Sequence, residues 1–129
     1  MAAFVIRVIV VLSQPFHLAA GSDAADYQRL AVSLATGHGW GVSHYAPAGG
    51  PTALRAPLYP LFVAGIYKVI GVHLTAARLG GAVLGAVAVA LLVVTTWTLF
   101  GRTVALATGA IGTILPSLVL ASTALMTEA

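Results

Sequence analysis

The chain has 129 residues, of which 60% are hydrophobic and only 7% are charged. Soluble domains carry roughly 25% charged residues, so this composition cannot cover a water-exposed surface and predicts an all-α integral membrane protein. The net charge of +3 arises from six basic residues scattered singly against three acidic ones, which argues against nucleic acid as a partner. Cysteine is absent, which excludes disulfides and thiol sites.

The first apolar segment covers about residues 1–20 and contains only a few polar side chains. We interpret it as a retained membrane helix that is kinked near its outer end by Pro15. A cleavable signal peptide is the alternative, with Leu18-Ala19-Ala20 as a loose cleavage site. Its charged amino-terminal region would then be a lone Arg7 preceded by apolar residues, which favours the membrane helix.

Residues 21–27, Gly-Ser-Asp-Ala-Ala-Asp-Tyr, hold two of the three acidic residues and lie where the first apolar segment ends. Carboxylates at a membrane boundary are the first candidates for chemistry. Ser22 and Asp23 are also favourable N-cap residues for an amphipathic helix along the membrane surface. Asp23 and Tyr27 share a face of that helix, whereas Asp26 lies off this face. The alternative to a function for the aspartates is therefore a capping box, with Asp26 at the third helical position.

Gly37 is expected to end this helix, and residues 38–56 form a Gly-, Pro- and aromatic-rich loop at headgroup level. Loops of this length are often functional. Pro57 is expected to be the first residue of the next helix, over about 57–72. That apolar stretch is short for a span, so we expect a surface or partly sunken helix with Lys68 reaching toward water. A further membrane span here is the alternative.

Two uncharged segments follow and are predicted to be membrane helices, at about residues 77–100 and 103–127. Gly81 and Gly85 form a Gly-x-x-x-Gly pair that would let another helix approach closely. Glycine is also simply common in membrane helices, which is an equally good explanation of the pair. Pro116 is expected to form a tolerated kink in the last helix.

The number of spans decides which groups share a membrane face. With three spans, the outer loop, about residues 21–76, and Glu128 lie on the same side, whereas a fourth span would put Glu128 on the opposite side. In the three-span arrangement Arg7 and Arg102 would be cytoplasmic. The remaining basic residues would lie outside, against the positive-inside rule: Arg29, Arg55, Lys68 and Arg78.

Several short motifs follow one another along the chain. The first three are Asp23-Ala-Ala-Asp26-Tyr27, Leu34-Ala-Thr-Gly37-His-Gly39 and Arg55-Ala-Pro57-Leu58-Tyr59-Pro60. The later ones are Ala77-Arg78-Leu79, Phe100-Gly101-Arg102, Leu115-Pro116-Ser117 and Thr127-Glu128-Ala129. In this order and spacing the chain resembles the amino-terminal part of the C-type membrane glycosyltransferases, and most nearly the protein mannosyltransferases and bacterial aminoarabinose transferases.

The resemblance implies a multi-pass plasma-membrane enzyme that takes a sugar from a polyprenyl-phosphate carrier in the lipid and transfers it to a sugar, lipid or protein acceptor at the outer face. It implies no additional cofactor. Asp23 falls at the position of the family's catalytic acidic residue. Its carboxylate would act as the general base toward the acceptor hydroxyl. Arg55 falls where the family places a basic residue near the lipid phosphate. Glu128 matches a second acidic position that could orient Arg55 or the sugar.

Tyr27, Tyr59 and Asp26 are secondary candidates for substrate contacts. Both tyrosines are also explained as aromatic residues at the membrane interface. The histidines of the loop, His38 and His44, are a weak metal signal because they stand alone in a glycine-rich stretch. The two aspartates could also bind a divalent ion through oxygen ligands, but a pair alone seldom holds one. We therefore expect no metal site.

Members of the resembled family are several times longer than this chain. We therefore expect an amino-terminal fragment that is inactive or incomplete by itself, with the remainder of its own chain as a partner. The alternative from another class is a small non-enzymatic membrane protein, such as a flippase-like protein for lipid-linked sugars or an accessory subunit.

Overall fold

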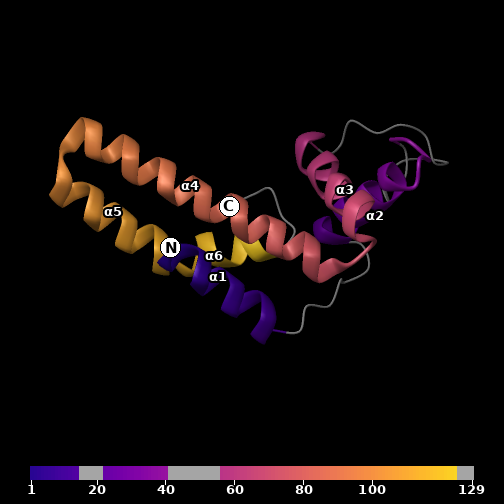
Figure 1. Cartoon of the computed structure of the whole chain (residues 1–129), viewed down its shortest axis with the longest axis horizontal. Coiled ribbons are helices and arrows are strands. Elements are labelled where there is room, and N and C mark those ends of the chain that lie inside the picture. The colour runs from indigo at the N-terminus through magenta and orange to yellow at the C-terminus, as the bar shows by residue number, and fades with distance from the viewer. Residues whose placement is uncertain (15–21, 41–55, 125–129) are drawn as a thin grey trace.

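The computed structural model describes residues 1–14, 22–40 and 56–124, and the regular elements in these ranges are α-helices (Figure 1). This confirms the all-α prediction. The helices are α1 (Ala2–Ser13), α2 (Asp23–Ala35), α3 (Leu58–Ile70), α4 (Leu74–Phe100), α5 (Arg102–Ile114) and α6 (Pro116–Thr123).

Helix α4 organises the molecule. It forms an antiparallel hairpin with α5, and α1 and α6 pack against both of these helices (Figure 1). The pair of α2 and α3 lies at the other end of α4 from the hairpin turn, and α3 contacts α4 there. The turn itself is made at Gly101, whose φ of 83° suits a residue without a side chain. The turn falls between the two last apolar segments, which the sequence predicts at about residues 77–100 and 103–127.

Helix α2 is capped by Ser22, whose hydroxyl accepts a hydrogen bond from the backbone N–H of Ala25 at 3.3 Å. Asp23 is therefore the first helical residue and Asp26 the fourth. The predicted capping box between the two aspartates is wrong, because the neighbouring serine takes the cap. The helix ends as predicted just before Gly37, where φ reaches 82°.

Helices α2 and α3 share a small core with the beginning of α4. Small side chains let the helices approach closely, and Tyr67 from α3 donates a hydrogen bond from its hydroxyl to the side-chain oxygen of Gln28 in α2. Pro57 is the N-cap of α3, so the expectation that it is the first helical residue is wrong by one position. The buried members of this core are Ala24, Ala31, Val63, Ala64, Tyr67 and Ala77.

The membrane spans are confirmed only in part. Helix α4, with 27 residues, is long and apolar enough to cross a membrane. Helices α5 and α6 pass the same test only when taken together, across a bend of 55° at Pro116. Helix α1 has 12 residues and ends at Ser13, short of the roughly 20 residues that a span needs. Pro15, the expected kink in the first segment, lies outside the described residues. Three spans therefore stay a prediction.

The Gly-x-x-x-Gly pair of α4 is the crossing point of α6. A Cβ added to Gly81 would overlap with the backbone carbonyl oxygen of Ser122. A Cβ added to Gly85 would lie 2.5 Å from the Cβ of Ser122 and 2.9 Å from Nε of Arg7. The prediction that this pair admits a second helix is confirmed, and α6 is that helix.

Candidate functional site

The two aspartates of α2 lie in the same first turn but in different surroundings. Asp26 is fully buried, at 0% exposure, whereas Asp23 is half-buried. A buried carboxylate is costly unless it is hydrogen-bonded or paired. We therefore infer that Asp26 contributes to the packing of α2, beyond starting the helix. A general base must be reachable by its substrate. Of the two, Asp23 meets that requirement.

Tyr27 and Tyr59 bring two of the sequence motifs into contact. Their rings lie edge to face, with centroids 5.5 Å apart and an interplanar angle of 89°. Tyr27 follows the aspartates in α2, and Tyr59 lies in the first turn of α3, close in sequence to Arg55. The pair therefore joins the helix of the candidate base to the helix that follows the candidate phosphate-binding residue.

The hydroxyl of Tyr59 is a hydrogen-bond donor over the whole physiological range. Burial raises the pKa of Tyr59 to about 12, with smaller contributions from the neighbouring hydroxyls of Tyr67 and Tyr27. Burial also raises the pKa of Tyr67, partly offset by its hydrogen bond to Gln28. A phenol is uncharged at neutral pH even at its ordinary pKa of 10.0, and the upward shifts extend this state to more alkaline pH, so both hydroxyls can donate a hydrogen bond.

A groove of about 580 Å³ opens beside Tyr59, between α3, α4 and α6. Its lining is mainly apolar, and the hydroxyls of Tyr59 and Ser122 provide polar groups. Gly81 and Gly85 also line the groove, next to the point where Ser122 of α6 packs against α4. Such a groove suits a long apolar group that carries a polar end.

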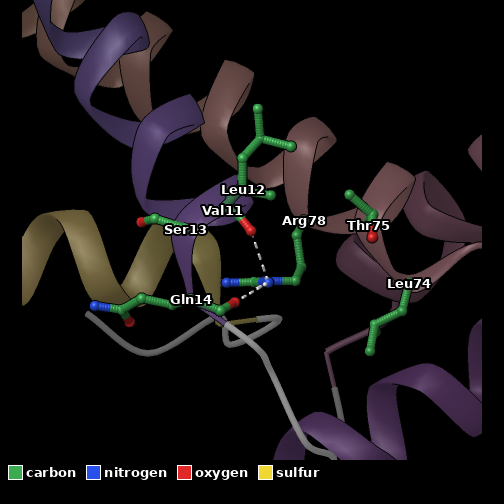
Figure 2. Close-up of a pocket in the computed structure, with 7 residues that line it drawn as sticks. All are labelled: Val11, Leu12, Ser13, Gln14, Leu74, Thr75 and Arg78. Atoms are coloured by element: carbon green, nitrogen blue, oxygen red, sulfur yellow. Dashed lines mark hydrogen bonds between the residues drawn. The ribbon is translucent and has the colours of Figure 1, made fainter.

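A second cavity, of about 390 Å³, lies between the end of α1 and the beginning of α4 (Figure 2). The guanidinium of Arg78 faces α1, and its Nη1 donates to the carbonyl oxygens of Val11 at 3.1 Å and Gln14 at 3.2 Å. Its Nε donates to the carbonyl oxygen of Thr123 at 2.9 Å. Carbonyls at helix ends lack partners within the helix, so Arg78 ties the ends of α1 and α6 to α4.

Arg7 is the other buried arginine, with only 1% of its surface exposed. Its Nε donates to Oγ of Ser122 at 3.0 Å, its Nη1 to the carbonyl of Ala3 at 3.0 Å, and its Nη2 to the carbonyl of Gly112 at 3.3 Å. Both arginines are buried in the packing between helices, and the side of the membrane on which each lies stays a prediction. Sequence reasoning missed these roles, although ionisable residues in apolar segments usually make internal contacts.

The other site residues lie outside the described ranges. Arg55 and Glu128 fall there, so their meeting with Asp23 stays a prediction. Within residues 1–14, 22–40 and 56–124, no group of three or more His, Cys, Asp or Glu side chains could hold a metal ion. His38 has its Nδ1 at 2.8 Å from Oγ1 of Thr36, and His44 also lies outside these ranges.

Comparison with known proteins identifies the second part of the chain. Residues 54–129 match the family described as dolichyl-phosphate-mannose-protein mannosyltransferase. The match covers more than half of the 129 residues and includes helices α3 to α6. No curated protein and no solved structure matched the chain. The matched region begins after Asp23, so the assignment of that residue rests on the motif order and on its position in α2.

Proposed function

This chain belongs to the dolichyl-phosphate-mannose-protein mannosyltransferase family, and from that premise we propose that it forms part of a membrane glycosyltransferase with a polyprenyl-phosphate-linked sugar as donor. The observation that carries the proposal is the edge-to-face contact of Tyr27 and Tyr59 beside the apolar groove. This contact joins the helix of Asp23 to the family-matched region, residues 54–129, which includes Arg55. The apolar helix α4 agrees with a membrane location.

The proposed reaction is a single displacement at the anomeric carbon of the donor. The oxygen of an acceptor hydroxyl forms the new bond to that carbon, and the bond from the carbon to the phosphate oxygen breaks. The electron pair leaves with the polyprenyl phosphate, and the carboxylate of Asp23 takes the proton of the hydroxyl. A single displacement inverts the configuration of the sugar, so the product stereochemistry reports on this proposal.

The leaving group gains negative charge as the bond breaks, and Arg55 is proposed to stabilise it. A guanidinium presents two parallel N–H groups that match phosphate oxygens. Its neighbour in the sequence, Ala56, lines the groove next to Tyr59, which favours a phosphate position at this end of the groove. Glu128 is proposed to orient Arg55 or the sugar.

The groove is proposed to hold the first isoprenoid units of the carrier. Its lining is mainly apolar, and burial of apolar surface stabilises by about 25 cal/mol per Å². The Tyr59 hydroxyl is uncharged at neutral pH, so it can donate to an oxygen of the phosphate or the sugar without bringing a competing negative charge.

The test is transfer of radiolabelled mannose from polyprenyl-phosphate mannose, measured in membranes that contain the protein expressed from its complete reading frame. Asp23→Asn is expected to lower the transfer rate on the order of 10²- to 10⁴-fold, the usual contribution of a general base, with donor binding retained. Arg29→Gln, at an exposed position of the same helix, is the control and should transfer normally. Normal transfer by Asp23→Asn would exclude the assigned role. Failure of the wild-type protein both to bind the donor and to transfer would favour the small non-enzymatic membrane protein.

A further inference from the structure

The break between α5 and α6 leaves the carbonyl of Gly112 without its helical partner. In an uninterrupted helix the N–H of residue 116 would donate to the carbonyl of residue 112. Residue 116 is a proline and has no N–H, so the carbonyl of Gly112 loses that bond. Gly112 is buried, and a buried carbonyl without a partner is unfavourable.

Arg7 supplies the missing donor from another helix. Its Nη2 lies 3.3 Å from the carbonyl oxygen of Gly112 in α5, and its Nε lies 3.0 Å from Oγ of Ser122 in α6. Ser122 in turn donates from the same hydroxyl to the carbonyl of Val119, at 2.9 Å. One guanidinium therefore bonds both sides of the 55° bend. Its fixed planar geometry allows this, whereas the single ammonium of lysine would not match both acceptors in the same way.

The bend determines where Ser122 lies. The backbone of Ser122 lies so close to Gly81 that a Cβ there would overlap with its carbonyl oxygen, and the hydroxyl of Tyr59 would lie 3.5 Å from the same Cβ. Ser122 and Tyr59 thus lie beside the same glycine and line the same groove. A straighter α5–α6 would withdraw Ser122 from this position and change the wall of the groove.

We infer that Arg7 is a positioning residue for the transfer reaction: it fixes the bend at Pro116 and so holds the α6 wall of the donor groove opposite Tyr59. The effect of Arg7 on transfer rests on the proposed function. The effect of Arg7 on the bend does not depend on any activity. The competing explanation is that Arg7 only satisfies a buried carbonyl and that the bend itself has no role.

Pro116→Ala separates these two explanations. It restores an N–H that can donate to the carbonyl of Gly112 and lets α5 and α6 run on as one helix. In the double variant with Arg7→Met, the carbonyl is satisfied again, so stability should return toward that of the wild type. Transfer should nevertheless stay low, because the bend is lost.

The bend can be measured directly because the chain has no cysteine. Spin labels on cysteines introduced at Leu106 in α5 and Leu120 in α6, which are 62% and 50% exposed, report the distance across the break by pulsed electron resonance. Arg7→Met is expected to lengthen and broaden this distance and to lower transfer on the order of 10- to 100-fold, as expected for misplacement of a substrate-binding wall. Arg102→Met, at the exposed hairpin turn, is the control and should change neither the spin-label distance nor the transfer rate.

The outcomes separate the inference from the proposed function. An unchanged distance in Arg7→Met overturns the inference, and so does wild-type transfer by the double variant. If Arg7→Met does not fold, Pro116→Ala alone carries the test: it should be stable, give a longer distance and transfer poorly, and normal transfer would contradict the inference. If the wild-type protein shows no transfer at all, the proposed function fails, while the spin-label distances still decide whether Arg7 fixes the bend.

Discussion

The ring of Tyr27 meets the ring of Tyr59 edge to face, with centroids 5.5 Å apart, and this contact brings together two motifs that are far apart in the sequence. Tyr27 is 3% exposed and is part of the packing between α2 and α3, whereas the hydroxyl of Tyr59 borders the apolar groove. The pair therefore links the position of Asp23 to the groove that we propose for the lipid carrier.

Removing the hydroxyl of Tyr59 should affect the donor rather than the fold. Tyr59→Phe keeps the aromatic contact, so we expect a loss of stability below about 1 kcal/mol, the typical net value of one hydrogen bond, with several-fold weaker donor binding. Tyr59→Ala also removes the ring and its edge-to-face contact with Tyr27, which alone should cost about 0.5–1.5 kcal/mol of stability in addition to the lost apolar burial. Thermal unfolding in detergent measures the loss of stability in each variant, and titration with the donor measures the loss of donor binding. A stable Tyr59→Ala variant would show that the ring contact does not hold α2 and α3 together.

The raised pKa of Tyr59 gives a specific alkaline response. The folded state holds the phenolic proton up to a pKa of about 12, whereas the unfolded chain releases it near the ordinary value of 10.0. The free energy of unfolding should therefore be independent of this group below about pH 10 and fall between about pH 10 and about 12, because the unfolded state there binds fewer protons. Tyrosinate absorbance during titration should lose its latest-titrating component in Tyr59→Phe. A titration curve with the same late component in that variant would contradict the assignment.

Gly81 should not tolerate a side chain. Gly81→Ala places a methyl group against the backbone carbonyl of Ser122, which cannot move like a flexible side chain, so a loss of about 1–3 kcal/mol is expected from overpacking. Gly65→Ala in α3 is the control, because a Cβ there meets nothing within 4 Å. It should be stabilising by roughly 0.5–1 kcal/mol, from the higher helix propensity of alanine. Equal unfolding temperatures for the two variants would contradict the close crossing of α6 over α4.

Arg78 should matter for assembly of the helices. Arg78→Met removes hydrogen bonds to the ends of α1 and α6, each worth about 1.5–3 kcal/mol when one partner is charged. We expect a destabilised variant in which α1 becomes accessible to proteases. Lys68→Met, at an exposed position in α3, should have the stability of the wild type. If Arg78→Met is equally stable and equally resistant to proteolysis, the hydrogen bonds of Arg78 do not hold the helix ends together.

Local signals in the sequence were sufficient for the elements whose ends depend on local chemistry. The end of α2 just before Gly37 and the close crossing at Gly81 each follow from a glycine that a side chain would disturb. The cap of α2 was predicted only to within one residue, because Ser22 and Asp23 are comparable caps and the surrounding structure decides between them.

Contacts between distant helices could not be predicted in the same way. Arg7, Arg78 and Asp26 are buried because other helices pack against them. The periodicity of residues along a single helix does not show which helices these are. Pro116 predicted a kink but not the size of the bend, which is 55°. We infer that this size depends on the hydrogen bond from Arg7 to Gly112. That bond joins residues 105 positions apart, so a local sequence pattern does not reveal it.

We propose that Asp23, Arg55 and Glu128 act together at one face of the membrane. The chain contains no cysteine, so single cysteines at positions 23, 102 and 128 can be labelled from outside with a membrane-impermeant thiol reagent. We predict labelling from outside at positions 23 and 128 and protection of position 102 at the hairpin turn. Labelling of positions 23 and 128 from opposite sides of the membrane would contradict the proposed site.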